Sequence, residues 1–146
     1  MPRVVSAFVA CLIGVGVATA ATAVEPVNLV ATPSVKDQLR SAFLRAHRRY
    51  APAKVRGPLK RRTYYGRYGR KEYAVASFSV PGTGTTDQPE LFRRPRGGVW
   101  RDLGDTGGDV CPPSVPRALL RLWNFVLASS TVVNGRRVYC YAPRAG

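Results

Sequence analysis

The sequence predicts an α+β fold, in which a mostly antiparallel sheet carries two helices packed on one face and one disulfide bond, preceded by a signal peptide. Three observations predict it. Residues 72–80 alternate between two sets of side chains with a period of two, which is typical of a strand. Asn134-Gly135 stands between two runs of β-forming residues and predicts a tight hairpin. Apolar residues recur with helical spacing in two segments, 34–51 and 115–128.

The first 23 residues have the pattern of a secretory signal peptide. Arg3 provides a positive start, residues 4–17 are mainly apolar, and small residues at the cleavage positions predict a cut after Ala20 or Ala23. A membrane anchor is the alternative, but the apolar run is shorter than the roughly 20 residues that a span needs. We therefore expect a secreted, extracellular protein that contacts the membrane only transiently, through this peptide.

The remaining chain is long enough for one domain with one core. Residues 24–33 contain two prolines and no periodicity, which predicts a linker, so the single domain covers 34–146. The first helix is expected to start at Ser34, because Asp37 follows three residues later as in a capping box, and to end before Pro52. Its apolar stripe consists of Val35, Leu39, Ala42, Phe43 and Ala46.

The middle of the chain predicts four strands. Residues 63–68 precede the clearest strand, 72–80, in which Ala74 and Ala76 leave room for a helix to pack closely. Residues 90–94 and 99–103 flank a Pro95–Gly98 turn and predict a hairpin.

The last part of the chain predicts a helix and a hairpin. Ser114 is the expected cap of a second helix over 115–128. The closing hairpin pairs 131–133 with 137–141.

Three cysteines are present, and Cys11 lies in the predicted signal peptide. Cys111 and Cys140 remain in an oxidising compartment, where a disulfide is the default expectation. A metal or nucleophilic role is the alternative, but a metal site would need more ligands nearby, and the chain has one histidine.

The chain is strongly basic, with 23 Lys and Arg residues against 8 acidic ones and a formal charge of +15. Such a surface attracts polyanions, although a merely solvated basic surface is the alternative. The pattern predicts a non-enzymatic binding protein that acts on an anionic cell-envelope polymer or an extracellular protein partner. The predicted basic face consists of Arg48, Arg49, Lys60, Arg61, Arg62, Arg67, Arg70 and Lys71.

Nucleic acid is a less favoured partner. Tyr64, Tyr65 and Tyr68 interleave with the basic residues and could stack on single-stranded bases. No RNA-binding signature accompanies them, so an edge strand protected by its charges is the preferred interpretation.

The alternative function is a small secreted hydrolase or nuclease. His47 is the sole histidine and would need a carboxylate partner, Glu72 or Glu90, for acid–base work. A solvated histidine at the end of an arginine-rich helix is the ordinary interpretation, so the sequence predicts no catalytic residue, no cofactor and no metal.

Two acidic patterns in the glycine-rich segment were weighed as sites. Asp105-Thr106-Gly107 spells the triplet of aspartic proteases, but a single triplet would require a homodimer, and an ordinary turn is favoured. Asp102, Asp105 and Asp109 could hold calcium, although their spacing is not that of an EF-hand loop.

The segments YAVASF, TTDQPELF, GDTGGDVC and VPRALLRLW resemble small secreted actinobacterial proteins of unknown function. The resemblance covers about Tyr73 to Trp123. It implies export and carries no activity.

Overall fold

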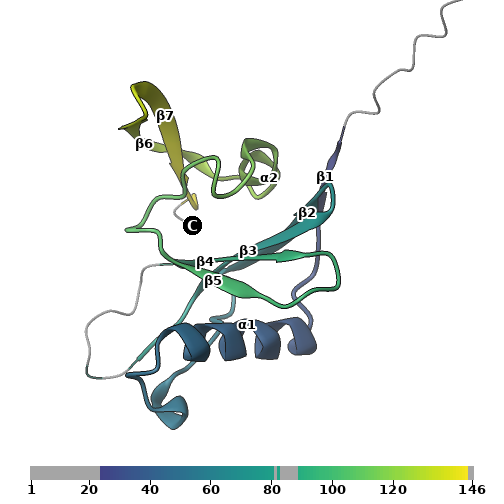
Figure 1. The fold of residues 1–146 in the computed structure, drawn as a ribbon, viewed down its shortest axis with the longest axis vertical. Helices are drawn as coiled ribbons and strands as arrows, with labels where there is room; N and C mark the ends of the chain where they lie inside the picture. The colour runs from purple at the N-terminus through teal and green to yellow at the C-terminus, as the bar shows by residue number, and fades with distance from the viewer. Residues whose placement is uncertain (1–23, 81, 83–88, 145–146) are drawn as a thin grey trace, which may run out of the picture.

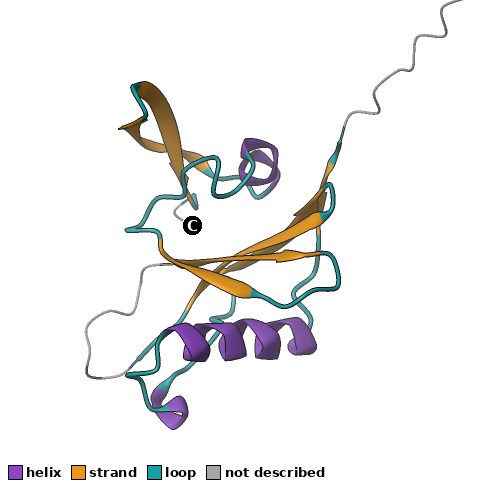
Figure 2. Cartoon of the chain, in the orientation of Figure 1, coloured by secondary structure: helices purple, strands orange, loops and turns teal. Residues whose placement is uncertain are grey.

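The structure is a computed structural model that describes residues 24–80, 82 and 89–144 (Figure 1). Five strands form an antiparallel meander in the order β1-β2-β3-β4-β5, and two more form a separate hairpin, β6-β7 (Figure 2). The strands span Pro26–Asn28 (β1), Thr63–Tyr68 (β2), Lys71–Ser77 (β3), Pro89–Pro95 (β4), Arg101–Asp105 (β5), Val126–Val133 (β6) and Arg136–Ala142 (β7). The helices span Pro33–Ala46 (α1), Pro52–Lys54 (η1, a 3-10 turn) and Arg117–Leu122 (α2).

Strand β3 forms the centre of the fold, because apolar side chains fill both of its faces. Ala74 and Ala76 pack with α1 residues such as Phe43 in one hydrophobic cluster. Val75, on the other face, packs with Leu119 of α2 in a second cluster. The predicted α+β class, the antiparallel sheet, the two helices and the disulfide are confirmed. The expected position of both helices on one face is wrong: α1 and α2 cover opposite faces (Figure 1), since each apolar face of β3 needs its own cover.

Helix α1 starts one residue before the expected position. Thr32, and not Ser34, is the N-cap, since its Oγ1 accepts a hydrogen bond from the Val35 N–H at 3.3 Å. Pro33 then occupies the first turn, where its missing N–H costs nothing.

The segment expected to be a linker, 24–33, contributes a strand. Residues 26–28 form β1, which pairs antiparallel with β2 from Pro26↔Tyr68 to Asn28↔Gly66. Proline is tolerated there because β1 is the edge strand of the sheet.

Helix α2 is much shorter than the expected 115–128. It ends at Leu122, and Asn124 adopts a left-handed conformation with φ 59° that stops the helix. The chain then enters β6 at Val126, which pairs with Ala142, so the closing hairpin is longer than predicted. The α2 helix approaches β2 closely at Gly66, where a Cβ would lie 2.8 Å from a Leu119 methyl carbon.

The Cys111–Cys140 disulfide is confirmed, and its two cysteines are 29 positions apart along the chain. It ties the segment after β5 to β7, next to the bridge between Val110 and Tyr141. None of the described helices is long and apolar enough to cross a membrane. The predicted signal peptide and its cleavage points lie outside the described residues.

Candidate active site at the end of helix α1

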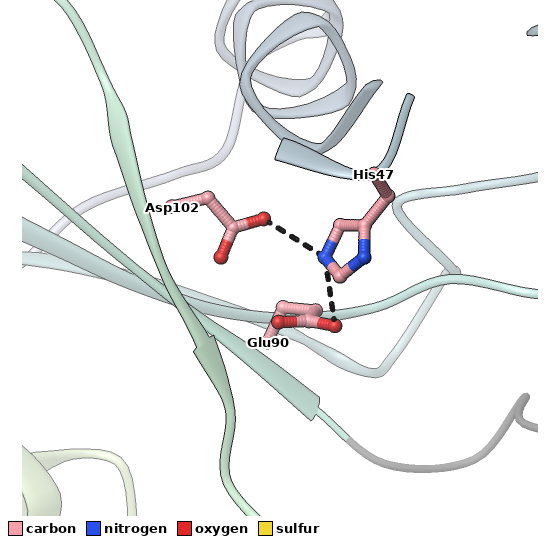
Figure 3. Close-up of side chains that lie close together, drawn as sticks. All are labelled: His47, Glu90 and Asp102. Carbon is pink, nitrogen blue, oxygen red and sulfur yellow. Dashed lines mark ion pairs between the residues drawn. The ribbon is translucent and has the colours of Figure 1, made fainter. Parts of the chain in front are cut away.

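Three side chains that can exchange protons or bind a metal ion lie together where α1 ends against the sheet: His47, Glu90 and Asp102 (Figure 3). His47 is the C-cap of α1, and its backbone N–H donates to the Phe43 carbonyl at 2.9 Å. Its ring stacks on Phe43 with centroids 4.3 Å apart, so the helix end fixes the position of the imidazole.

Both carboxyl groups come from the face of the sheet that α1 covers. Glu90 of β4 lies two residues before Phe92, a member of the α1-side cluster, and Asp102 of β5 pairs with Phe92 across the strands. Strand alternation therefore places both side chains on the α1 side. Figure 3 shows one nitrogen of the His47 ring pointing at both carboxyl groups.

The distances are short for ion pairs but long for hydrogen bonds. His47 Nε2 lies 3.3 Å from Glu90 Oε1 and 3.5 Å from Asp102 Oδ2. The three side chains are 22%, 10% and 2% exposed in the order His47, Glu90, Asp102. Among the described residues, none forms a well-directed hydrogen bond to His47 Nε2, Glu90 Oε2 or Asp102 Oδ2. The other oxygen of Asp102, Oδ1, accepts the Gly104 N–H at 2.8 Å.

Burial and mutual repulsion disfavour the charged carboxylates. Burial, together with the negative charges of Asp102 and Asp105, raises the pKa of Glu90 to about 8. Burial also raises the pKa of Asp102, although the Gly104 N–H and His47 oppose that shift. The centre therefore favours protonated carboxyl groups over two ionised carboxylates.

A small cavity of about 130 Å³ borders the centre. His47 and Glu90 line it together with Arg49, Tyr50 and Asp105, and Phe43, Phe78 and Val80 form its apolar wall. Arg49 donates a hydrogen bond to the Tyr50 hydroxyl at 3.0 Å. The cavity thus combines an acid–base pair with a guanidinium that can bind an anion, while Asp102 lies behind it.

His47 and Glu90 are possible acid–base partners in the sequence, where neither has an assigned catalytic role, and Asp102 belongs there to the calcium hypothesis. The other candidate, Glu72, instead accepts a hydrogen bond from Arg94 at 2.6 Å. Two buried aromatic residues could have indicated this site from the sequence. Glu90 lies two residues before buried Phe92, and Asp102 lies two residues after buried Trp100, so each carboxylate shares a strand face with a buried aromatic ring. That alternation places both carboxylates on a core face.

The acidic patterns weighed in the glycine-rich segment have local partners. Asp105 Oδ1 accepts the Gly107 N–H at 2.6 Å, as in an ordinary Asx turn. Asp109 accepts a hydrogen bond from the Ser129 hydroxyl. Of the three aspartates, Asp102 alone belongs to the group of metal-competent side chains found among the described residues.

The predicted basic face is distributed over several parts of the fold. Arg48 and Arg49 follow α1. Residues 60–62 precede β2, and residues 70–71 follow it, so these two groups lie about 17 Å or more apart, at opposite ends of a six-residue strand. Arg67 lies within β2. Arg49 is the member of this set that lines the cavity at the candidate site.

A second basic depression lies on the face opposite α1. Lys71, Arg93 and Arg101 line a cavity of about 370 Å³ together with Arg94, Pro95 and Val99. Arg93 pairs directly with Arg101 across β4 and β5, and with Tyr73 of the α2-side cluster across β3 and β4. Lys71 belongs to the predicted basic face, whereas Arg93 and Arg101 do not, because only strand pairing brings these two arginines together.

Comparisons with protein-family models, with curated proteins and with solved structures find no match to this chain. The resemblance to secreted actinobacterial proteins therefore stays a prediction.

Proposed function

We propose that the protein is a small exported hydrolase with an anionic substrate, and that His47, Glu90 and Asp102 form its catalytic centre. One observation carries this proposal: His47 Nε2 lies 3.3 and 3.5 Å from two buried carboxyl groups, beside a cavity that Arg49 also lines. A histidine with a carboxylate partner in a cavity is the arrangement that acid–base hydrolysis needs.

Each residue has a role that follows from its position. His47 and Glu90 border the cavity and would exchange protons with water and the leaving group. Asp102 is a positioning residue, because it lies behind the imidazole and does not line the cavity. Arg49 would hold the anionic group of the substrate. The formal charge of +15 favours an anionic substrate such as a phosphodiester over a cationic one.

The test is a hydrolysis assay of the purified, disulfide-intact protein with bis(p-nitrophenyl) phosphate, p-nitrophenyl phosphate and a labelled RNA. We expect turnover of at least one of them, and a loss on the order of 100-fold or more in His47→Ala and Glu90→Gln. Arg61→Ala is the matched control, since Arg61 lies away from the cavity lining and should leave the rate unchanged. Absence of turnover, or equal rates in His47→Ala and the parent, would refute the proposal.

A second candidate function is binding of an anionic cell-envelope polymer, with an extracellular protein as the other partner class. The depression lined by Lys71, Arg93 and Arg101 favours it, because three cationic side chains surround one cavity. Retention on an anionic wall polymer should fall steeply with salt. It should weaken more in Arg93→Glu with Arg101→Glu than in Arg61→Glu with Arg62→Glu. Equal effects of the two pairs would show a generic charge effect.

Export is part of the proposal. The Cys111–Cys140 disulfide supports it, since such bonds persist in oxidising compartments. Amino-terminal sequencing of the protein recovered outside the producing cell should find a start at Ala21 or Val24. A start at Met1 or Pro2 would contradict cleavage.

A further inference from the structure

We propose that His47, Glu90 and Asp102 bind one divalent transition-metal ion, with zinc as the best fit, through His47 Nε2 and one oxygen of each carboxylate. The binding claim stands on the geometry alone, whereas the role of the metal in hydrolysis rests on the proposed function. The fourth position of the ion would face the cavity that Arg49 and Tyr50 line.

The distances between the ligand atoms agree with this ion. A tetrahedral zinc site with metal–ligand bonds of about 2.0–2.1 Å has neighbouring ligand atoms about 3.3–3.5 Å apart. His47 Nε2 lies 3.3 Å from Glu90 Oε1 and 3.5 Å from Asp102 Oδ2. Hydrogen bonds from nitrogen to oxygen are usually about 2.7–3.2 Å long, so these separations fit a shared ion better than a direct bond. The candidate ligand atoms of the three residues all lie within 4.8 Å of one another.

Asp102 supplies a second, independent observation. Its side chain is 2% exposed, and its Oδ2 lies 3.5 Å from His47 Nε2 but accepts no well-directed hydrogen bond from the described residues. A buried carboxylate oxygen without a partner is costly, and a cation would remove that cost. The Gly104 N–H holds the other oxygen at 2.8 Å, which is the outer-shell support that orients metal-binding carboxylates.

The donor set selects the class of metal. Calcium takes six to eight oxygen ligands and magnesium prefers octahedral oxygen coordination, whereas this centre offers one imidazole nitrogen and two carboxylates. Imidazole with carboxylate suits zinc and neighbouring transition metals. The charge of +15 repels cations at long range, so affinity must come from direct ligation at this buried point.

A metal here would supply chemistry that the cavity can use. Three protein ligands with one open position are typical of catalytic zinc, and such an ion lowers the pKa of its bound water to about 7. When bound, the metal would supply an activated water, and His47 and Glu90 would then serve as its ligands in place of the proton-exchange role proposed for them in the metal-free centre. Arg49 would stay free of the metal and bind the anionic group of the substrate.

The test titrates zinc and cobalt(II) into the chelator-treated, disulfide-intact protein, using calorimetry for zinc and visible absorption for cobalt. We expect one ion per chain and the intense visible bands of tetrahedral cobalt. His47→Ala, Glu90→Gln and Asp102→Asn should each weaken binding by about 10–100-fold or more. Asp37→Asn is the matched control, because Asp37 is an exposed carboxylate on the same helix.

A second measurement avoids variants that fail to fold. X-ray absorption of the zinc-loaded parent protein should show one imidazole nitrogen, oxygen ligands and no sulfur. No saturable binding at millimolar metal, or binding that the three substitutions leave unchanged, would overturn the inference, and the centre would then be a histidine in direct contact with two carboxyl groups.

The inference and the proposed function fail separately. Binding of zinc without hydrolysis of any substrate would leave the metal site standing and refute the hydrolase. Hydrolysis that depends on His47 but survives complete removal of metal would support the hydrolase and refute a role of the metal in hydrolysis, while the titration would still decide whether the metal binds.

Discussion

Two clusters of buried polar residues lie on the α1 face of the sheet, and they differ in how well their members are satisfied. In the first, Arg94 bonds Glu72 at 2.6 Å and Gln38 at 2.7 Å, and its guanidinium lies 4.5 Å from the centre of the Trp100 ring. In the second, His47, Glu90 and Asp102 contact one another without well-directed hydrogen bonds among the described residues.

This difference distinguishes charged residues that stabilise the fold from charged residues that are available for chemistry. Glu72 and Arg94 have opposite charges and match each other, so their cluster is complete without a ligand. The His47 centre contains two carboxyl groups against one imidazole, so it carries an excess of negative charge when both are ionised. An incomplete buried cluster that borders a cavity is the better candidate for chemistry.

The largest effect is expected when a substitution breaks the Glu72–Arg94 cluster. Arg94→Ala should lower the free energy of unfolding by about 3–5 kcal/mol, because it leaves the buried carboxylate of Glu72 without its partner. Arg93→Ala is the matched control: the neighbouring arginine is exposed on the opposite face and should change stability by about 0.5 kcal/mol or less. Urea denaturation measures both. Equal effects would mean that the Glu72–Arg94 pair contributes no more than a surface charge.

An intermediate effect is expected when a zinc ion binds the His47 centre. Zinc at a hundred times its dissociation constant should raise the free energy of unfolding by about 2.7 kcal/mol, provided that it binds the folded state alone. Thermal melts with and without zinc measure the shift, and Asp102→Asn should reduce it strongly. A shift of the same size in Asp102→Asn would place the metal elsewhere.

A third effect, spread gradually over several pH units, comes from the protons of the metal-free centre. Because folding raises the pKa of Glu90 from 4.5 to about 8, the folded state holds a proton that the unfolded state releases between these values. Stability should therefore fall as pH rises from about 4.5 to 8, by at most about 1.4 kcal/mol per unit from this group. The raised pKa of Asp102 also makes stability fall as pH rises. Asp105 and His47 are the other ionisable residues that face Glu90.

The matched variants are Glu90→Gln and Glu72→Gln, compared by denaturation across that pH range. Glu90→Gln should flatten the slope, because glutamine does not titrate and keeps the shape of the neutral acid. Glu72→Gln should keep the slope and lower stability across that pH range, since it removes a charged partner of Arg94. An unchanged slope in Glu90→Gln would show that another group controls the pH dependence.

Much of the fold could be predicted from local sequence. The strand over 63–68, the hairpin around Asn134-Gly135 and the disulfide were confirmed, because period-two alternation, an Asn-Gly turn and a lone cysteine pair act over short range or leave one option. The second helix was overestimated, since its apolar residues from Phe125 onward suit a strand as well as a helix. Residues 26–28 were missed because an edge strand of three residues has no periodicity to detect.

The sequence by itself determined the charge, the alternating central strand, the cysteine pair and the presence of one histidine. Tertiary structure decided that β3 is buried on both faces and that the helices therefore lie on opposite sides. It also decided that His47 contacts Glu90 and Asp102, which follow it along the chain by 43 and 55 positions. Periodicity assigns each of those residues to a face, but only strand pairing and helix packing set the distances between them, and chemistry depends on those distances.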